Sequence, residues 1–156
     1  NMSFGSYAES NTLKTALEYA YNTTILVAAA GNDGICIGPG SGCAPFFPAA
    51  YTYVLGVEDR PIGGYTNFDQ DGPIATNWII QQLNYELAAP GTEIISTIPN
   101  GGYGTLTGTS MATPLVAGGL ALYAQEKPED SKELIFGTLV KSSGATYLDF
   151  LAALIV

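Results

Sequence analysis

The sequence contains no histidine among its 156 residues. Histidine is the side chain that most often acts as a general base near neutral pH, and it is a common zinc ligand. The chain by itself therefore lacks a general base of the usual kind and cannot form a histidine-based metal site. Chemistry that pairs a serine with a histidine would need its histidine from elsewhere.

Basic residues and long apolar runs are also scarce. Lysine and arginine together number 5 against 14 aspartates and glutamates, which gives a net charge of −9. This balance argues against nucleic acids and anionic membranes as partners, because phosphate binding requires a basic face. No apolar run reaches the ~18 residues of a membrane-spanning helix. With 47% apolar residues, the chain is too apolar to be disordered, and its length indicates one domain or part of one.

There are only two cysteines, Cys36 and Cys43, in a stretch rich in glycine and proline. Two ligands do not fill a zinc site. A local disulfide is one interpretation, and it suits a secreted protein. Two reduced, unreactive thiols are the other.

The first fifty residues predict a strand, a helix and a second strand. Residues 1–5 are typical of a strand end, and residues 24–30 form a continuous apolar run that suits a parallel strand buried on both faces. Between them, apolar residues recur at helical spacing after a capping Ser10 or Asn11. The periodic residues are Leu13, Ala16, Leu17, Ala20 and Tyr21. This βαβ order predicts an α/β fold.

Further strands are expected at 53–58, 86–89 and 93–98, with a hairpin turn at 100–104. A helix rich in small residues is expected from 108–110 to about 125, with Gly118 and Gly119 allowing close backbone packing. Asp130 is expected to cap a helix that reaches about 141, and a last short helix covers 150–155. Residues 31–50 and 59–85 are predicted to be irregular. The apolar residues expected in the core of a larger sheet include Val54, Leu55, Ile94, Ile95, Leu115 and Leu122.

Ser110 lies in the segment GTSMATPLVAG, at the start of the long predicted helix. There, unpaired backbone N–H groups and the positive end of the helix dipole converge, and they stabilise the negative charge that develops in acyl transfer. A plain helix-capping serine is the alternative. Asn32 follows a buried strand in AAAGN, where its amide could donate to an oxyanion or simply occupy a turn.

Five segments in this order resemble the C-terminal half of the subtilisin-like serine peptidase family: NMSFGS, AAAGN, FFPAAY, ELAAPG and GTSMATPLVAGG. The resemblance implies a mainly parallel three-layer α/β/α sheet of subtilisin type, with the N-terminal half absent from this chain. Residues 1–156 would then be the C-terminal portion of a single catalytic domain. Residues 73–85 resemble an insertion in this pattern.

The resemblance also implies roles for individual residues. Ser110 would be the nucleophile, and Asn32 would donate its amide to the oxyanion beside the Ser110 N–H, supported by Thr109. The extended substrate would pair with Ser3, Phe4 and Gly5. The pocket for the residue before the cut would be lined by Ala29, Ala30 and Gly31. Phe46 would lie near the base of that pocket and make it shallow.

The aspartate and histidine blocks of the family precede the segment that resembles residues 1–6, and neither block occurs in this sequence. Leu115 stands where the family usually has a second, non-catalytic histidine. We therefore expect an N-terminal half that carries the aspartate and histidine, cut from this chain or encoded separately, and no peptidase activity from this chain alone. The alternative is a non-catalytic pseudopeptidase that binds extended peptides. A third interpretation is that the chain is a fragment of an active enzyme.

The implied chemistry needs no cofactor and no catalytic metal. Members of the family often bind calcium, so a structural calcium ion is compatible with the resemblance. Carboxylate oxygens that could bind such an ion occur at Asp33, Glu58, Asp59, Asp69 and Asp71. As acidic loop residues, they are expected to be solvated. The family resemblance further implies a secreted or extracellular protein that acts on peptides or proteins.

Overall fold

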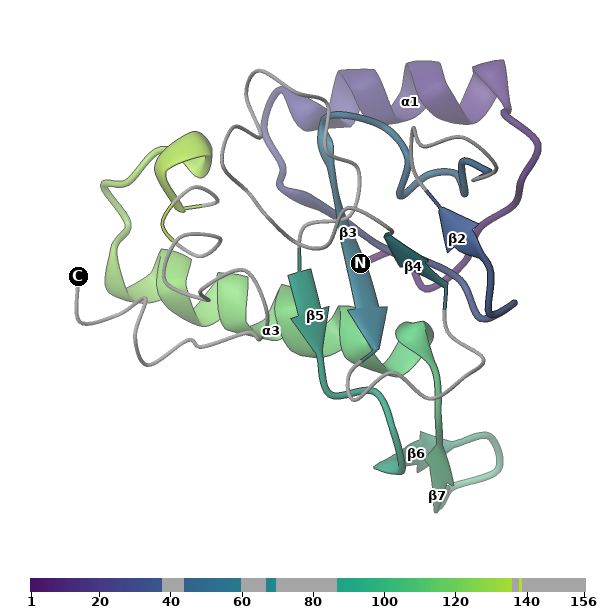
Figure 1. The fold of residues 1–156 in the computed structure, drawn as a ribbon. Helices are drawn as coiled ribbons and strands as arrows, with labels where there is room; N and C mark the ends of the chain where they lie inside the picture. Colours follow the sequence, from purple (N-terminus) through teal and green to yellow (C-terminus); the bar gives the residue numbers. More distant parts are fainter. Residues whose placement is uncertain (38–43, 60–66, 70–86, 136–137, 139–156) are drawn as a thin grey trace.

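The computed structural model describes residues 1–37, 44–59, 67–69, 87–135 and 138 (Figure 1). The predicted insertion at 73–85 and the predicted helix at 150–155 lie outside these residues. Cys43 and the side chain of Cys36 do as well, so their disulfide stays a prediction. Within the described ranges, no helix combines the length and apolar character needed to cross a membrane.

The centre of the fold is a parallel sheet with the strand order β1-β3-β5. It consists of β1 (Leu26–Ala29), β3 (Val54–Asp59) and β5 (Leu87–Ala89), and every residue in these strands is buried. Met2 adds a parallel bridge to Ala28, so the chain start extends the sheet beyond β1. The prediction of parallel strands buried on both faces is confirmed, although β1 is shorter than the apolar run at 24–30.

Two helices cover the two faces of this sheet. The first, α1 (Asn11–Tyr21), begins where the Ser10 hydroxyl accepts a hydrogen bond from the Leu13 N–H. The second, α3 (Thr109–Glu126), follows Gly108 as its N-terminal cap. Both helices have the bounds that the sequence predicts, within about one residue.

The strand residues alternate between two apolar clusters, one on each face of the sheet. Val27, Leu55 and Val57 pack with residues of α3 such as Val116. On the other face, residues including Leu26, Ala28 and Val54 pack with Leu17 of α1. Figure 1 shows α1 and α3 on opposite sides of the strands. The result is the three-layer α/β/α arrangement that the sequence predicts.

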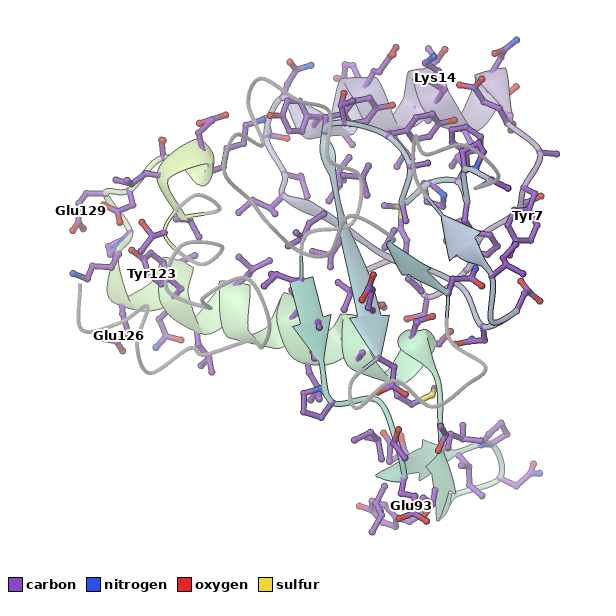
Figure 2. All side chains as sticks on the ribbon, in the orientation of Figure 1. Tyr7, Lys14, Glu93, Tyr123, Glu126 and Glu129 are labelled. Carbon is purple, nitrogen blue, oxygen red and sulfur yellow. The ribbon has the colours of Figure 1, made fainter. Side chains whose placement is uncertain are left out.

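A hairpin of β6 (Ile94–Ile98) and β7 (Gly102–Leu106) connects β5 to α3. Asn100 and Gly101 form its turn with φ values of 72° and 82°, the left-handed conformation of a tight hairpin turn. The hairpin projects from the body of the molecule, and Glu93 marks its start (Figure 2). The expected hairpin turn is thus confirmed.

A second small sheet pairs β2 (Cys36–Ile37) with β4 (Phe68–Asp69) in parallel. The segments 31–50 and 59–85 were both predicted to be irregular. Each contributes one short strand to this pair, so the prediction is corrected there. Two-residue strands carry too little periodicity to be recognised in a sequence.

Several other expectations are corrected. Ile95, Leu115 and Leu122 are 71%, 40% and 60% exposed, because the first lies on the projecting hairpin and the other two on the outer side of α3. A Cβ atom on Gly118 would have no neighbour within 4 Å, so close packing does not require this glycine, whereas Gly119 is buried.

The expected cap at Asp130 is also corrected. The helix that begins at residue 132 is capped by the Ser131 hydroxyl, which accepts from the Leu134 N–H at 3.2 Å. The Asp130 carboxylate instead accepts a hydrogen bond from the Tyr123 hydroxyl, at the end of α3.

Candidate active site

The candidate site lies at the carboxyl end of the parallel sheet, where the segments after Met2, β1 and β5 meet the start of α3. In open α/β sheets this edge is where ligands bind. The sequence-predicted residues Ser3, Asn32, Thr109 and Ser110 are brought together here, although up to 107 residues separate them in the chain. The local structure explains why each is held.

Ser110 lies in the first turn of α3, where backbone N–H groups have no partner within the helix. Its hydroxyl donates to the Ser3 carbonyl at 3.3 Å, and the Ser3 hydroxyl donates to the Ser110 carbonyl at 2.9 Å. That carbonyl needs an outside donor because the residue four positions on is Pro114, which has no N–H. The two serines therefore fix the start of α3 against residues 1–5.

Asn32 is attached to the same helix end through its carbonyl oxygen. The Asn32 Oδ1 accepts from the Thr109 N–H at 2.9 Å and from the Thr109 hydroxyl at 3.2 Å. The amide NH₂ of Asn32 makes no hydrogen bond to the described residues, and Asn32 is one of the residues that line the cavity beside Ser110. An amide held in this way can donate to an oxyanion without reorganising.

Thr109 is fully buried and joins the start of α3 to the segment after β1. Besides its bonds to Asn32, its hydroxyl accepts from the Gly31 N–H at 3.1 Å. Gly108 precedes it with φ 147°, and a Cβ atom there would lie 3.0 Å from the Asn32 Oδ1. This backbone conformation and close approach explain the glycine before Thr109.

A cavity of about 420 Å³ opens beside Ser110. Its lining includes residues 4–7, Ala29, residues 31–33, Phe46, Thr109 and Ser110. One predicted pocket residue, Ala30, lies elsewhere, and Ser3, which was predicted to pair with the substrate, is not among the lining residues. The Ala30 side chain is buried in the apolar cluster on the α1 face, and Ser3 contacts Ser110 instead of lining the cavity.

The backbone of Phe4 and Gly5 runs along the rim of this cavity. In the described part of the chain, the N–H and C=O groups of these two residues make no hydrogen bonds. By contrast, Met2 is paired with β1, and Ser6 exchanges two bonds with Phe47. An unpaired extended segment between two paired residues is suited to pairing with another extended chain.

Asn67 is a site residue that the sequence reasoning missed. Fully buried, it donates to the Ala30 carbonyl and the Tyr7 hydroxyl, and its Oδ1 accepts from the Asp33 and Ile35 N–H groups. The Tyr7 hydroxyl in turn donates to Asp33 at 2.7 Å. Burial, followed by this hydrogen bond, raises the pKa of the Tyr7 phenol. Asn67 stands alone among residues predicted to be irregular, so no pattern marked it.

Asp59 was expected to be a solvated loop residue, and the structure corrects this. It ends β3, is fully buried, and accepts from the Gly91 N–H at 2.6 Å and the Thr92 hydroxyl at 3.0 Å. The Gly91 carbonyl then accepts from the Gly108 N–H at 2.9 Å. Asp59 thus fixes the turn against which the segment before Ser110 is held. Glu58, also expected in solvent, is buried as well.

No group of three or more acidic, thiol or imidazole side chains that could hold a metal ion occurs among the described residues. Asp71 and the side chain of Asp69 lie outside that part of the chain. A structural calcium ion therefore stays a prediction with no ligand assigned.

Comparisons with known proteins identify the family of the chain. A sequence model of the subtilase family, Peptidase_S8, matches residues 1–152. Subtilisin E of Bacillus subtilis (strain 168) is 36% identical over 149 residues, which are 95% of this chain and 35% of that protein. Subtilisin of Bacillus pumilus is also 36% identical over 149 residues, covering 95% of this chain and 49% of that protein.

The comparison with solved structures also finds similar folds. A protease from Pseudoalteromonas arctica PAMC 21717 superposes with a TM-score of 0.77 at 28% identity, covering 99% of this chain and 50% of that one. Sphericase superposes with a TM-score of 0.71 at 33% identity, covering 90% of this chain and 47% of that one. The chain thus spans between about a third and a half of the length of these relatives.

Proposed function

This chain belongs to the subtilase family, and from that membership we propose that it supplies the nucleophile, oxyanion hole and substrate-binding strand of a serine endopeptidase. The observation that carries the proposal is the arrangement around Ser110. The hydroxyl lies at a helix start, beside a cavity that Asn32 also lines, with the Asn32 carbonyl oxygen held by Thr109. These are the parts that acyl transfer requires on the serine side.

The proposed reaction begins when an extended peptide pairs with the backbone of residues 3–5 and places its scissile carbonyl beside Ser110. The Ser110 oxygen attacks the carbonyl carbon while an imidazole takes the hydroxyl proton. The Asn32 NH₂ and the Ser110 N–H stabilise the resulting oxyanion. The imidazole then protonates the leaving amine, and water releases the acyl group from Ser110 by the reverse sequence.

The imidazole in this scheme, and the carboxylate that orients it, come from polypeptide outside the 156 residues. The chain has no histidine, and it spans 35% of Subtilisin E. We propose that an N-terminal half carries both groups, on a separate chain or in a longer protein. When the imidazole is in place, it replaces the Ser3 carbonyl as the acceptor of the Ser110 hydroxyl proton.

We also propose that the assembled protein is secreted and that its chemistry uses no cofactor. Support for secretion comes from membership of the family. The proposal includes a Cys36–Cys43 disulfide, and a count of free thiols before and after mild reduction tests that bond. A structural calcium ion remains part of the proposal for the assembled protein. Chelation followed by thermal unfolding tests that part.

The central experiment treats the native protein, with every co-purifying chain, with a fluorophosphonate that labels activated serines. We expect labelling of Ser110, loss of labelling in Ser110→Ala, and hydrolysis of a chromogenic peptide. In subtilisin itself, removing the serine lowers turnover by about 10⁶ and removing the oxyanion asparagine by about 10²–10³. Asn32→Ala should lower turnover by about 10²–10³ here, with Ser110 still labelled but at a lower rate.

Two outcomes would change the proposal. Hydrolysis by the purified 156-residue chain that disappears in Ser110→Ala would disprove the need for an outside imidazole. Absence of labelling in the complete native sample, together with binding of extended peptides, would instead favour the non-catalytic pseudopeptidase. A denaturing gel and intact mass of the same sample show whether a second polypeptide of comparable size is present.

A further inference from the structure

Phe46 contacts both walls of the cavity beside Ser110. One wall is the segment around Gly5 and the other is the segment around Gly31, and both glycines line the cavity. A Cβ atom on Gly5 would overlap the edge of the Phe46 ring. A Cβ atom on Gly31 would lie 3.2 Å from the Cε1 and from the Cζ of the same ring. The tip of the ring therefore lies between the two walls.

The ring is also held in this position. Tyr7 packs against it edge to face, with the ring centroids 4.9 Å apart and an interplanar angle of 67°. The next residue, Phe47, exchanges two backbone hydrogen bonds of 2.8 Å with Ser6, and the Phe46 carbonyl accepts from the Ala50 N–H at 2.9 Å. With its backbone fixed and aromatic contact on one side, the ring cannot leave the cavity without breaking these contacts.

The cavity has a defined role if the function proposed above holds. Ser110 and Asn32 line it, and the unpaired backbone of residues 4 and 5 forms its rim. A peptide whose carbonyl carbon lies beside the Ser110 hydroxyl must direct the side chain of that same residue toward the space between the walls. The residue before the cut is therefore the one whose side chain meets Phe46.

We propose that Phe46 is a specificity-determining residue that restricts the residue before the cut to small, uncharged side chains such as glycine, alanine and serine. A large aromatic or branched side chain would overlap the ring edge between the walls. The volume of about 420 Å³ belongs to the whole open cleft along Ser110, and the ring occupies its narrow part between Gly5 and Gly31. The inference rests on the proposed function, because it names the substrates of that same site.

Charge in the cavity supports the restriction to uncharged residues. Among the described residues that line the cavity, Asp33 is the only ionisable one apart from Tyr7. Its carboxylate already accepts a hydrogen bond from the Tyr7 hydroxyl. An acidic side chain would be repelled by Asp33. A lysine or arginine side chain would have to pass the Phe46 ring before it could benefit from that carboxylate.

The test uses the complete protein, with its aspartate- and histidine-bearing polypeptide, and peptides that differ only in the residue before the cut. With alanine, leucine, phenylalanine or lysine there, we expect kcat/KM for alanine to exceed that for phenylalanine at least about 10-fold. Phe46→Ala should raise the phenylalanine-to-alanine ratio by at least about 10-fold. Tyr19→Ala, an exposed aromatic on α1, is the matched control and should leave the ratio unchanged.

A binding measurement separates failure of this inference from failure of the proposed function. The same peptides are titrated against Ser110→Ala and against Ser110→Ala with Phe46→Ala, so the result does not depend on turnover. Tighter binding of alanine peptides that disappears with Phe46→Ala supports the inference even if nothing is cleaved. The inference is overturned if peptides with phenylalanine or lysine are bound or cleaved as efficiently as those with alanine. If no peptide binds, both proposals are overturned. Phe46→Leu replaces Phe46→Ala if the latter does not fold.

Discussion

The parallel sheet and the β6–β7 hairpin are both β structure, but they are stabilised in opposite ways. Every residue of β1, β3 and β5 is buried, whereas every residue of β6 and β7 is exposed or only half-buried. Apolar packing on two faces stabilises the sheet. The hairpin depends on its own backbone pairing and on its turn, and it projects away from both helices (Figure 1).

The difference shows where the site derives its rigidity. Asn32 follows β1 and Asp59 ends β3, and both strands belong to the buried sheet. The hydrogen bonds made at the ends of these strands are buried or partly buried. The hairpin lies between β5 and α3 in sequence, but the Gly91–Gly108 hydrogen bond closes the chain across its base. Changes in the hairpin should therefore stay local, and changes in the sheet should reach the whole fold.

The largest expected effect compares two aliphatic side chains. Leu55 in β3 is 1% exposed and Ile95 in β6 is 71% exposed. Leu55→Ala should lower the free energy of unfolding by about 2–5 kcal/mol, because it removes buried contacts and leaves a cavity. Ile95→Ala should change it by less than about 0.5 kcal/mol. Urea titrations of the two variants measure this, and equal losses would refute the distinction.

A sharper comparison uses two threonine hydroxyls that each accept one backbone N–H. Thr109 accepts from Gly31 in the buried site, and Thr107 accepts from Glu93 at the exposed base of the hairpin. Thr109→Val should cost about 1–3 kcal/mol of unfolding free energy, since the Gly31 N–H is left buried without an acceptor. Thr107→Val should cost at most about 0.5 kcal/mol, because water replaces the lost acceptor. A similar cost at both positions would contradict this account.

Within the hairpin itself, the turn is expected to matter more than the packing. Gly101 has φ 82°, and a Cβ atom there would meet nothing within 4 Å. Gly101→Ala should cost about 1 kcal/mol through backbone strain alone. Gly102→Ala, where the added Cβ makes an ordinary 3.5 Å contact with Ile98, is the matched control and should cost less. Thermal unfolding of both variants decides between backbone strain and packing as the cause.

The smallest expected effect is a pH dependence in the body of the protein. Burial, followed by the charge of Glu18, raises the pKa of Tyr53 to about 12. A raised phenol pKa means that folding favours the protonated form, so this stabilisation is complete below pH ~10 and is lost as the pH rises toward 12. Tyr53→Phe should therefore flatten the decline in urea midpoint between pH 10 and 12. An unchanged slope would show that Tyr53 does not contribute.

Much of the sheet, and both of the long helices, could be predicted because their residues carry a local pattern. Leu13, Leu17 and Tyr21 recur at the period of a helix, and the run that contains β1 is continuously apolar, as a strand buried on both faces requires. The exposed positions could not be predicted this way. Ile95 and Leu122 are as apolar as Leu55, and only the tertiary arrangement leaves them on the surface.

The site shows the same division. Ser110 and Asn32 were recognisable because each lies in a short characteristic segment at the end of a predicted element. Asn67 and Asp59 were not, because their roles depend on partners 32 to 60 residues away in the chain. A buried polar residue is identified by the backbone groups it satisfies, and those groups are known only once the fold is known.

The paired hydrogen bonds between Ser3 and Ser110 have a consequence for synthesis of the protein. They join residues separated by 107 positions, so the ribosome must release nearly the whole described chain before they can form. Closing so long a loop costs entropy that only the packed sheet and α3 can offset. A nascent or half-folded chain therefore presents Ser110 without the Ser3 contacts that hold the start of α3 in place.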